Sequence, residues 1–174
     1  VGSSDEFLAW VATQPSLVTA KIKLENSEDG AQSAAWESAQ AEYGLVFGPH
    51  NDRRLNVIWT TPETPIVGDV LRCFGEPQYY RAYNKSFVDR QQFIGELWYP
   101  SNGLKFWLVD PLPVKKVGLD TVVKGLVVGR PGSAESLAID VFPNVKSASE
   151  ARSIVEQLRS WPGRVEAIQI EEVR

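Results

Sequence analysis

The side chains best suited to covalent or acid–base chemistry in this sequence are a single histidine, His50, and a single cysteine, Cys73. A hydrolase that pairs a nucleophile with a histidine base would have to be built on His50, and no nucleophile signature surrounds it. Residues 48–52 combine glycine, proline, asparagine and aspartate, which is typical of a turn between two strands. We therefore predict no catalytic residue, and a hydrolase centred on His50, of unknown substrate, is the alternative function.

Metal and cofactor chemistry also lacks its usual ligand patterns. With one histidine and one cysteine, a zinc site would depend on carboxylates, which suit zinc poorly. A calcium loop at His50 would need acidic residues at spacings that the sequence does not provide. The glycines form neither a Walker loop nor a dinucleotide fingerprint. We expect no cofactor and no bound metal, and we expect Cys73 to be a small buried residue on a helix.

Aromatic side chains are the strongest functional signal that remains. In the aromatic pairs at 79–80, 98–99 and 106–107, adjacent residues of a strand must point to opposite faces of the sheet. One member of each pair therefore lies outside the main core, where the C-terminal helices cover it or where it binds a protein, peptide or glycan. We predict an interaction face on the sheet. Its expected members are Tyr80, Trp98, Trp107, Tyr83 and Trp36.

The composition excludes several other classes of protein. The 174 residues are 43% hydrophobic and 23% charged, which is typical of one globular unit with a sizeable core. The net charge is −4 and the lysines and arginines are scattered, so we expect no nucleic-acid partner. No apolar run approaches the ~18 residues that a membrane-spanning helix requires, so we expect no transmembrane segment. The sequence makes no prediction of oligomeric state.

A helix followed by an antiparallel meander is predicted for residues 64–110. Apolar residues with helical spacing run from Val67 to Phe74, and Gly75 supplies the end of the helix. The segments that follow are rich in β-branched and aromatic residues, and a turn at 100–103 joins the last two. The expected strands are residues 78–83, 92–99 and 104–109.

The N-terminal part, residues 1–61, is predicted to begin with a helix at 4–14. Alternation of apolar and polar residues then indicates strands, with a polar loop at 25–32. A turn around residues 42–44 is expected between the second strand and the third. The expected strands are residues 16–24, 34–41, 43–47 and 54–60.

An internal duplication relates residues 1–61 to residues 62–113. Trp36 corresponds to Trp98, and the motif Gly-Leu-x-Phe begins at both Gly44 and Gly103. The sequence therefore predicts an α+β fold in which a helix-plus-antiparallel-meander unit occurs twice in tandem. The whole chain, 1–174, is expected to be a single compact unit.

The C-terminal part, residues 114–174, is predicted to be a helical and strand extension. A strong apolar stripe that includes Ile154, Leu158 and Trp161 requires a partner surface. We therefore expect the tail from about Leu119 to pack on the outer aromatic face of the sheet and to leave part of that face for a partner. The expected elements are a strand or bent pair at 119–128 with Gly125 at the bend, a helix at 149–161 and a strand at 164–173. Residues 133–142 alternate as a strand would but also have helical spacing, and the cap at Ser133 with Glu135 favours a helix.

The motifs GDVLRCFGEP at 68–77, LWYP at 97–100 and GLKF at 103–106 resemble those of the bacterial envelope lipoproteins of the SmpA/OmlA (BamE) type. In tandem they resemble the β-lactamase inhibitor protein, whose fold repeats such a unit. The chain is also similar to exported lipoproteins of filamentous green bacteria, which share its WPG signature at 161–163.

These resemblances imply a scaffold that carries no catalytic residue. They imply an extracytoplasmic place in the cell envelope, with a leader or a lipid anchor that this sequence does not contain; the start at Val1 and the absence of methionine fit that expectation. The expected function is a non-enzymatic interaction or envelope-scaffold module that uses the aromatic-rich sheet face. The expected partner is a protein or an envelope glycan.

Overall fold

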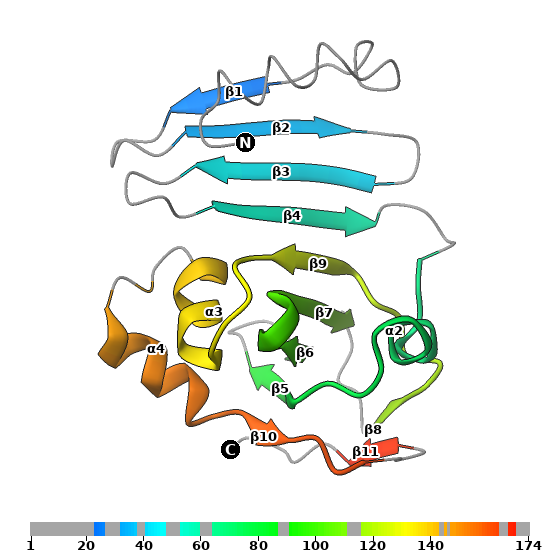
Figure 1. The fold of residues 1–174 in the computed structure, drawn as a ribbon. Helices are drawn as coiled ribbons and strands as arrows, with labels where there is room; N and C mark the ends of the chain where they lie inside the picture. The colour runs from blue at the N-terminus through cyan, green and yellow to red at the C-terminus, as the bar shows by residue number, and fades with distance from the viewer. Residues whose placement is uncertain are drawn as a thin grey trace.

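The computed structural model describes residues 23–26, 32–37, 41–47, 53–59, 64–86, 91–110, 116–142, 145, 147–163 and 167–169. Within these residues the fold is α+β, and its three α-helices lie on the two sides of an antiparallel sheet (Figure 1). The helices are α2 (Val67–Phe74), α3 (Ala134–Val141) and α4 (Ala148–Val155).

The large sheet contains nine strands in the described part of the chain, and every pair of neighbours is antiparallel. In spatial order they are β1 (Lys23–Asn26), β2 (Gln32–Glu37), β3 (Ala41–Phe47), β4 (Arg53–Trp59), β9 (Gly125–Val128), β7 (Leu104–Asp110), β6 (Gln91–Tyr99), β5 (Tyr79–Ser86) and β10 (Arg159–Ser160). A separate pair consists of β11 (Ala167–Gln169) and β8 (Lys116–Gly118).

Strand β9 joins two meanders into one sheet. Strands β1 to β4 precede β5 to β7 along the chain. Strand β9 pairs with β4 on one side and with β7 on the other. Leu126, for example, lies opposite both Val57 and Phe106. The sequence placed the tail on top of the sheet, and that expectation was wrong for this strand. Gly125 is the first residue of β9 rather than a bend, and the turn lies earlier, at 119–120.

The predicted helix and meander at 64–110 are confirmed. Helix α2 begins after Ile66, whose N–H donates to the Asp69 carboxylate at 3.1 Å. It ends at Gly75, whose φ of 76° favours glycine. The turn between β6 and β7 is a short 3-10 helix, η1 (Pro100–Asn102), and Gly103 closes it with a φ of 67°. A Cβ atom at Gly103 would lie 2.5 Å from a backbone oxygen of the β9–α3 connection, so this turn requires glycine.

The two faces of the sheet carry separate cores. On the α2 face, alternate residues of β6 and β7 pack against α2. The buried members of this core are Val67, Val70, Phe93, Leu97, Tyr99, Phe106, Leu108, Val117 and Val123. On the opposite face, which we call the α3–α4 face, the two C-terminal helices cover the sheet. The buried members there are Trp98, Val127, Leu137, Ala138, Val141, Val145 and Ala151. The predicted packing of the tail on the outer aromatic face is confirmed for α3 and α4.

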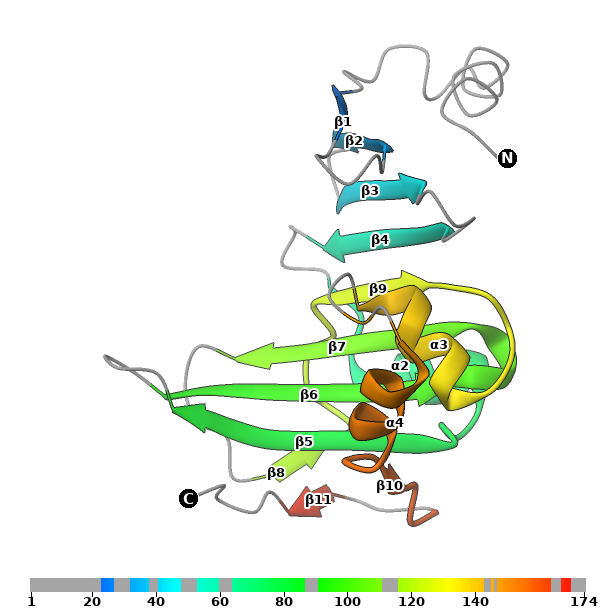
Figure 2. The same cartoon turned by 90° about the vertical axis from the view of Figure 1, so that its left-hand side faces the viewer.

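The helices cover only part of the α3–α4 face. Figure 2 shows α3 and α4 in front of the strands near η1, while the far ends of β5, β6 and β7 extend beyond them. These ends belong to the C-terminal part of β5, the N-terminal part of β6 and the C-terminal part of β7. Among the described residues, the part of the face that no helix covers is therefore next to α3 and α4, on the same three strands.

One of the two expected tail helices differs in length from the observed one. Helix α3 begins at its Ser133 cap as predicted, and α4 begins at a capping box of Ser147 and Glu150. The expected helix at 149–161 is too long, because the chain leaves the helix after Val155 and forms β10 against β5. Trp161 then packs edge-on against Tyr80, with ring centroids 5.9 Å apart.

Strands β2, β3 and β4 overlap the expected strands, but the turn around 42–44 is wrong. Of the strand expected at 16–24 only residues 23 and 24 are described, and β1 continues through residues 25 and 26 of the expected loop. Strand β3 runs through residues 42–44, and Gly44 lies opposite Ala35 on one side and Asn56 on the other. Gly44 is thus in the middle of a strand, whereas Gly103 is in a turn. The similarity between the two Gly-Leu-x-Phe motifs does not extend to the backbone. The expected helix at 4–14 lies outside the described residues.

Candidate functional site

The pairing of the strands divides the five predicted aromatic residues between different surfaces. Trp98, Trp107 and Tyr83 lie on the α3–α4 face, since Trp107 is opposite Glu96 and Tyr83 is opposite Ile94. Tyr80 is on the α2 face, where it packs against Trp161. Trp36 is on β2, in the other meander, and its side chain lies outside the described residues. The prediction of one shared face is therefore wrong for Tyr80.

Trp98 also differs from the expectation of an exposed aromatic surface. It is 0% exposed, and its ring lies 6.0 Å from the ring of Phe142 at the end of α3. Its neighbour Trp107 is only half-buried and forms the edge of the same core. Of the predicted aromatic residues on this face, Trp107 and Tyr83 are the two that can meet a partner without a change in the fold.

Three charged side chains lie under or beside the two helices on this face, and we call Arg81, Glu96 and Lys105 the charge cluster. Glu96 is 4% exposed and Lys105 is 1% exposed. The Lys105 ammonium is 3.3 Å from Glu96 Oε1, and the Arg81 guanidinium approaches Glu96 Oε2 at 2.9 Å through Nη2 and donates to it at 3.0 Å through Nε. The indole N–H of Trp98 donates to the same oxygen at 3.0 Å.

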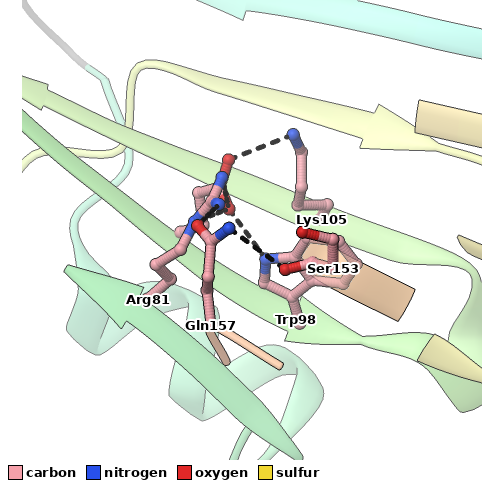
Figure 3. A network of polar contacts seen from close by, with 6 residues as sticks. Arg81, Trp98, Lys105, Ser153 and Gln157 are labelled. Carbon is pink, nitrogen blue, oxygen red and sulfur yellow. Dashed lines mark hydrogen bonds and ion pairs between the residues drawn. The ribbon is translucent and has the colours of Figure 1, made fainter. Parts of the chain in front are cut away.

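The charge cluster connects the sheet to the segment that follows α4. Arg81 donates through Nη1 to the side-chain oxygen of Gln157 at 3.0 Å. Gln157 in turn donates to the backbone oxygen of Ser153 at 3.0 Å (Figure 3). Because a fixed guanidinium plane donates to two acceptors at once, Arg81 sets the position of the chain after α4 relative to β5 and β6.

Lys105 lies among aromatic rings as well as beside a carboxylate. Its ammonium is 3.9 Å from the centre of the Phe142 ring and 5.1 Å from the centre of the Trp107 ring. A third ring, that of Trp98, is 5.8 Å away. A cation within about 6 Å of an aromatic ring is attracted to the ring face. Lys105 therefore stabilises the end of α3 on the sheet. Its positive charge lies over one face of each of these rings.

The acid in the charge cluster is ionised at neutral pH. Burial by itself raises the pKa of Glu96, because it removes water from the carboxylate. The charges of Lys105 and Arg81, with hydrogen bonds from Arg81 and Trp98, outweigh that effect and hold the pKa of Glu96 below its ordinary value. The three side chains thus form a buried, hydrogen-bonded ionic unit.

A hollow of about 180 Å³ lies beside the charge cluster, between the C-terminal end of α3 and strands β6 and β7. It is lined by Gln92, Ile94, Gly95, Glu96, Lys105, Trp107 and Phe142. Most of its wall is apolar, and Lys105 and Glu96 lie at its inner end because both are almost fully buried. Opposite Trp107 on β9 is Gly125, which has no side chain to fill the space beside the ring.

The titratable side chains in the wall of the hollow are paired with each other. Glu96 and Lys105 are held against each other, and the described residues that line the hollow include no serine, threonine or cysteine. Cys73 is exposed on α2, on the other side of the sheet, so the expectation that it is buried was wrong. His50 lies outside the described residues. In the described part of the chain, three or more potential metal ligands do not come together.

Sequence reasoning missed the charge cluster, although a signal for it was present. Glu96 and Lys105 alternate in phase with Trp98 and Trp107 on adjacent strands of a predicted hairpin. A charged residue two positions from a large buried aromatic residue indicates a buried polar contact on that face. The sequence has no comparable signal for the contact of Phe142 with Lys105, because that contact depends on where α3 lies on the sheet.

Comparison of the chain with protein-family models, with curated proteins and with solved structures finds no match. Among the described residues, every helix is too short or too polar to cross a bilayer. The function is therefore argued from the geometry of the site.

Proposed function

We propose that this chain is a non-enzymatic interaction module that binds a segment of another polypeptide on the uncovered part of the α3–α4 face. One side chain of that segment occupies the hollow. The observation that carries the proposal is the presence of half-buried Trp107 and Phe142 in the wall of a hollow at the point where the helices stop covering the sheet. Aromatic residues at the edge of a partly desolvated hollow are typical centres of protein recognition.

A polypeptide suits this surface better than a glycan does. A glycan presents many hydroxyl groups, and each of them needs a polar partner where it is buried. The carboxylate of Glu96 already interacts with Arg81, Lys105 and Trp98, and the remaining wall is mostly apolar. An apolar side chain gains from burial here without leaving hydroxyl groups unpaired.

Selection from a random peptide library on the purified protein tests the proposal. We expect peptides with a common apolar position, and we expect Trp107→Ala to weaken their binding at least about tenfold, which corresponds to roughly 1.4 kcal/mol. The matched control is Phe74→Ala, because Phe74 is 46% exposed but lies on α2, on the other side of the sheet. Equal affinity of the selected peptides for the Trp107→Ala variant and the unmodified protein would contradict the proposal.

The other sequence-based hypotheses remain proposals with less support. An extracytoplasmic place in the cell envelope is supported by the resemblance of the motifs at 68–77, 97–100 and 103–106. A tandem-repeat origin is supported by the presence of two antiparallel meanders, β1 to β4 and β5 to β7. The hydrolase centred on His50 predicts turnover of an ester, phosphate or glycoside that His50→Ala abolishes, and no described contact favours it.

A further inference from the structure

We infer that the hollow selects its occupant by charge: it accepts an uncharged apolar side chain, aromatic or aliphatic, of an extended polypeptide segment and discriminates against a cationic one, with Lys105 as the residue that determines this specificity. The inference deepens the proposed function and rests on it, because it names the chemistry of the side chain that the hollow holds.

The size of the hollow limits its occupant to one side chain. Pockets for drug-sized molecules have volumes of about 300–1,000 Å³, and the hollow has about 180 Å³. Its wall contains Ile94, Trp107 and Phe142, so the contacts that it offers are mainly apolar. An aliphatic or aromatic side chain projecting from a backbone that runs over the uncovered strands matches both the volume and the wall.

The position of Lys105 decides which charge the occupant can carry. Exposed aromatic rings ordinarily attract cations, so Trp107 and Phe142 alone would favour lysine or arginine in a partner. Here the Lys105 ammonium lies 3.9 Å from the centre of the Phe142 ring and 5.1 Å from the centre of the Trp107 ring. A second cation in the hollow would meet this buried positive charge at short range, where little water screens the repulsion.

The second cation of the charge cluster strengthens the same preference. Arg81 does not line the hollow, but it forms an ion pair with Glu96 in its wall, and its guanidinium is 5.9 Å from the centre of the Phe142 ring. The single negative charge of Glu96 faces two cations, Lys105 and Arg81, so these three side chains together carry one net positive charge toward an incoming cation. A cationic side chain would meet this net charge, whereas an uncharged apolar one would leave the ion pairs intact.

Binding of small probes of matched shape tests the inference on the full chain. The probes are 3-phenylpropionamide, which is neutral, 3-phenylpropionate, which is anionic, and 3-phenylpropylamine, which is cationic. Their dissociation constants are measured from the proton–nitrogen NMR signal of the Trp107 indole, assigned with Trp107→Phe. The internal control is the indole signal of Trp161, which packs on the other face of the sheet and should not move.

We expect the neutral and anionic probes to shift the Trp107 signal and the cationic probe to bind at least about tenfold more weakly. In Lys105→Met, which keeps most of the apolar stem of the side chain, the dissociation constant of the cationic probe should approach that of the neutral one. The comparison among the probes on the unmodified protein stands even where that variant does not fold. Equal binding of the neutral and cationic probes overturns the inference alone. No shift of the Trp107 signal with any probe overturns the proposed hollow together with it.

Discussion

The two faces of the same three strands, β5 to β7, are built in different ways. The α2 face is closed by apolar side chains such as Leu97 and Phe106, which need only to be removed from water. The α3–α4 face has an equally buried tryptophan, Trp98, but surrounds it with the charge cluster. Apolar burial is tolerant of small displacements, while ion pairs and hydrogen bonds require defined distances. The geometry of the α3–α4 face is therefore specified more closely than that of the α2 face, and the described helices cover it only in part.

The difference also concerns what each face loses when one residue changes. A buried ion pair contributes little net stability compared with an apolar pair of the same shape, because both ions lose their hydration. Removal of one partner is costly, since the other charge stays buried without compensation. The charge cluster thus contributes little net stability but fixes the positions of the side chains on the α3–α4 face. Four predictions test this difference between the two faces.

Glu96→Ala should produce the largest effect, a loss of about 3–5 kcal/mol in the free energy of unfolding. The reason is that the substitution leaves the ammonium of Lys105, which is 1% exposed, and the guanidinium of Arg81 without their carboxylate. Urea denaturation followed by tryptophan fluorescence measures it. The double variant Glu96→Ala with Lys105→Met should recover part of the loss, and a single-variant loss below about 1 kcal/mol would show that the cluster does not constrain this face.

Leu97→Ala tests the opposite face with a residue next to Glu96 in sequence. We expect a loss of about 2–4 kcal/mol, because Leu97 is 1% exposed and its removal leaves a cavity among apolar neighbours. The same urea denaturation, repeated at several pH values, should give a loss that does not vary with pH. A pH-dependent loss at Leu97 would mean that the two faces are coupled through the strand.

The pH dependence of stability should come from the α3–α4 face. Because the folded pKa of Glu96 is held below its ordinary value of 4.5, ionised Glu96 favours the folded state. Its contribution is fully present above about pH 4.5 and is lost as the pH falls through the lower folded pKa. The difference in unfolding free energy between the unmodified protein and Glu96→Gln should therefore decrease as the pH falls from neutral into that range. A constant difference would contradict the assignment.

Arg72→Ala should have the smallest effect, within about 0.5 kcal/mol. Arg72 and Asp69 form an ion pair of 2.6 Å on α2, shorter than any distance in the charge cluster, but the Arg72 side chain is 74% exposed. Water and salt screen such a pair, so its distance says little about its strength. Thermal unfolding of the variant at low and at moderate salt measures the effect, and a loss near that of Glu96→Ala would invalidate the contrast between buried and exposed ion pairs.

The parts of the fold that could be predicted from the sequence are those with local causes. Gly75 and Gly103 take positive φ values that end a helix and a turn, and alternation along β6 assigns Leu97 and Trp98 to opposite faces. Helical spacing also indicates that Cys73 points away from the α2 core, because Val70 and Leu71 point toward it. The helical spacing therefore favours an exposed Cys73, as the structure shows, over the buried one expected from residue type alone.

The parts that could not be predicted depend on contacts between distant segments. The residues of β9 do not indicate that this strand pairs with both β4 and β7. The spacing of Ile154, Leu158 and Trp161 continues a helix, but the pairing of β10 with β5 ends it and gives Trp161 a different partner. The hollow also depends on a contact between distant segments, since Phe142 reaches Lys105 only when α3 packs on the sheet.

The position of β9 also constrains the order in which the sheet can be completed. Strand β9 lies between β4 and β7 but follows both of them along the chain, so these two strands have no hydrogen-bonded neighbour on that side until residues 125–128 arrive. The pairing of β4 with β9 joins residues far apart in the sequence, such as Ile58 and Gly125, and non-local pairings of this kind slow folding. During synthesis, the edges of β4 and β7 that await β9 are open templates for strands of other chains. The same segment that unites the two meanders is therefore the one on which protection from intermolecular pairing depends.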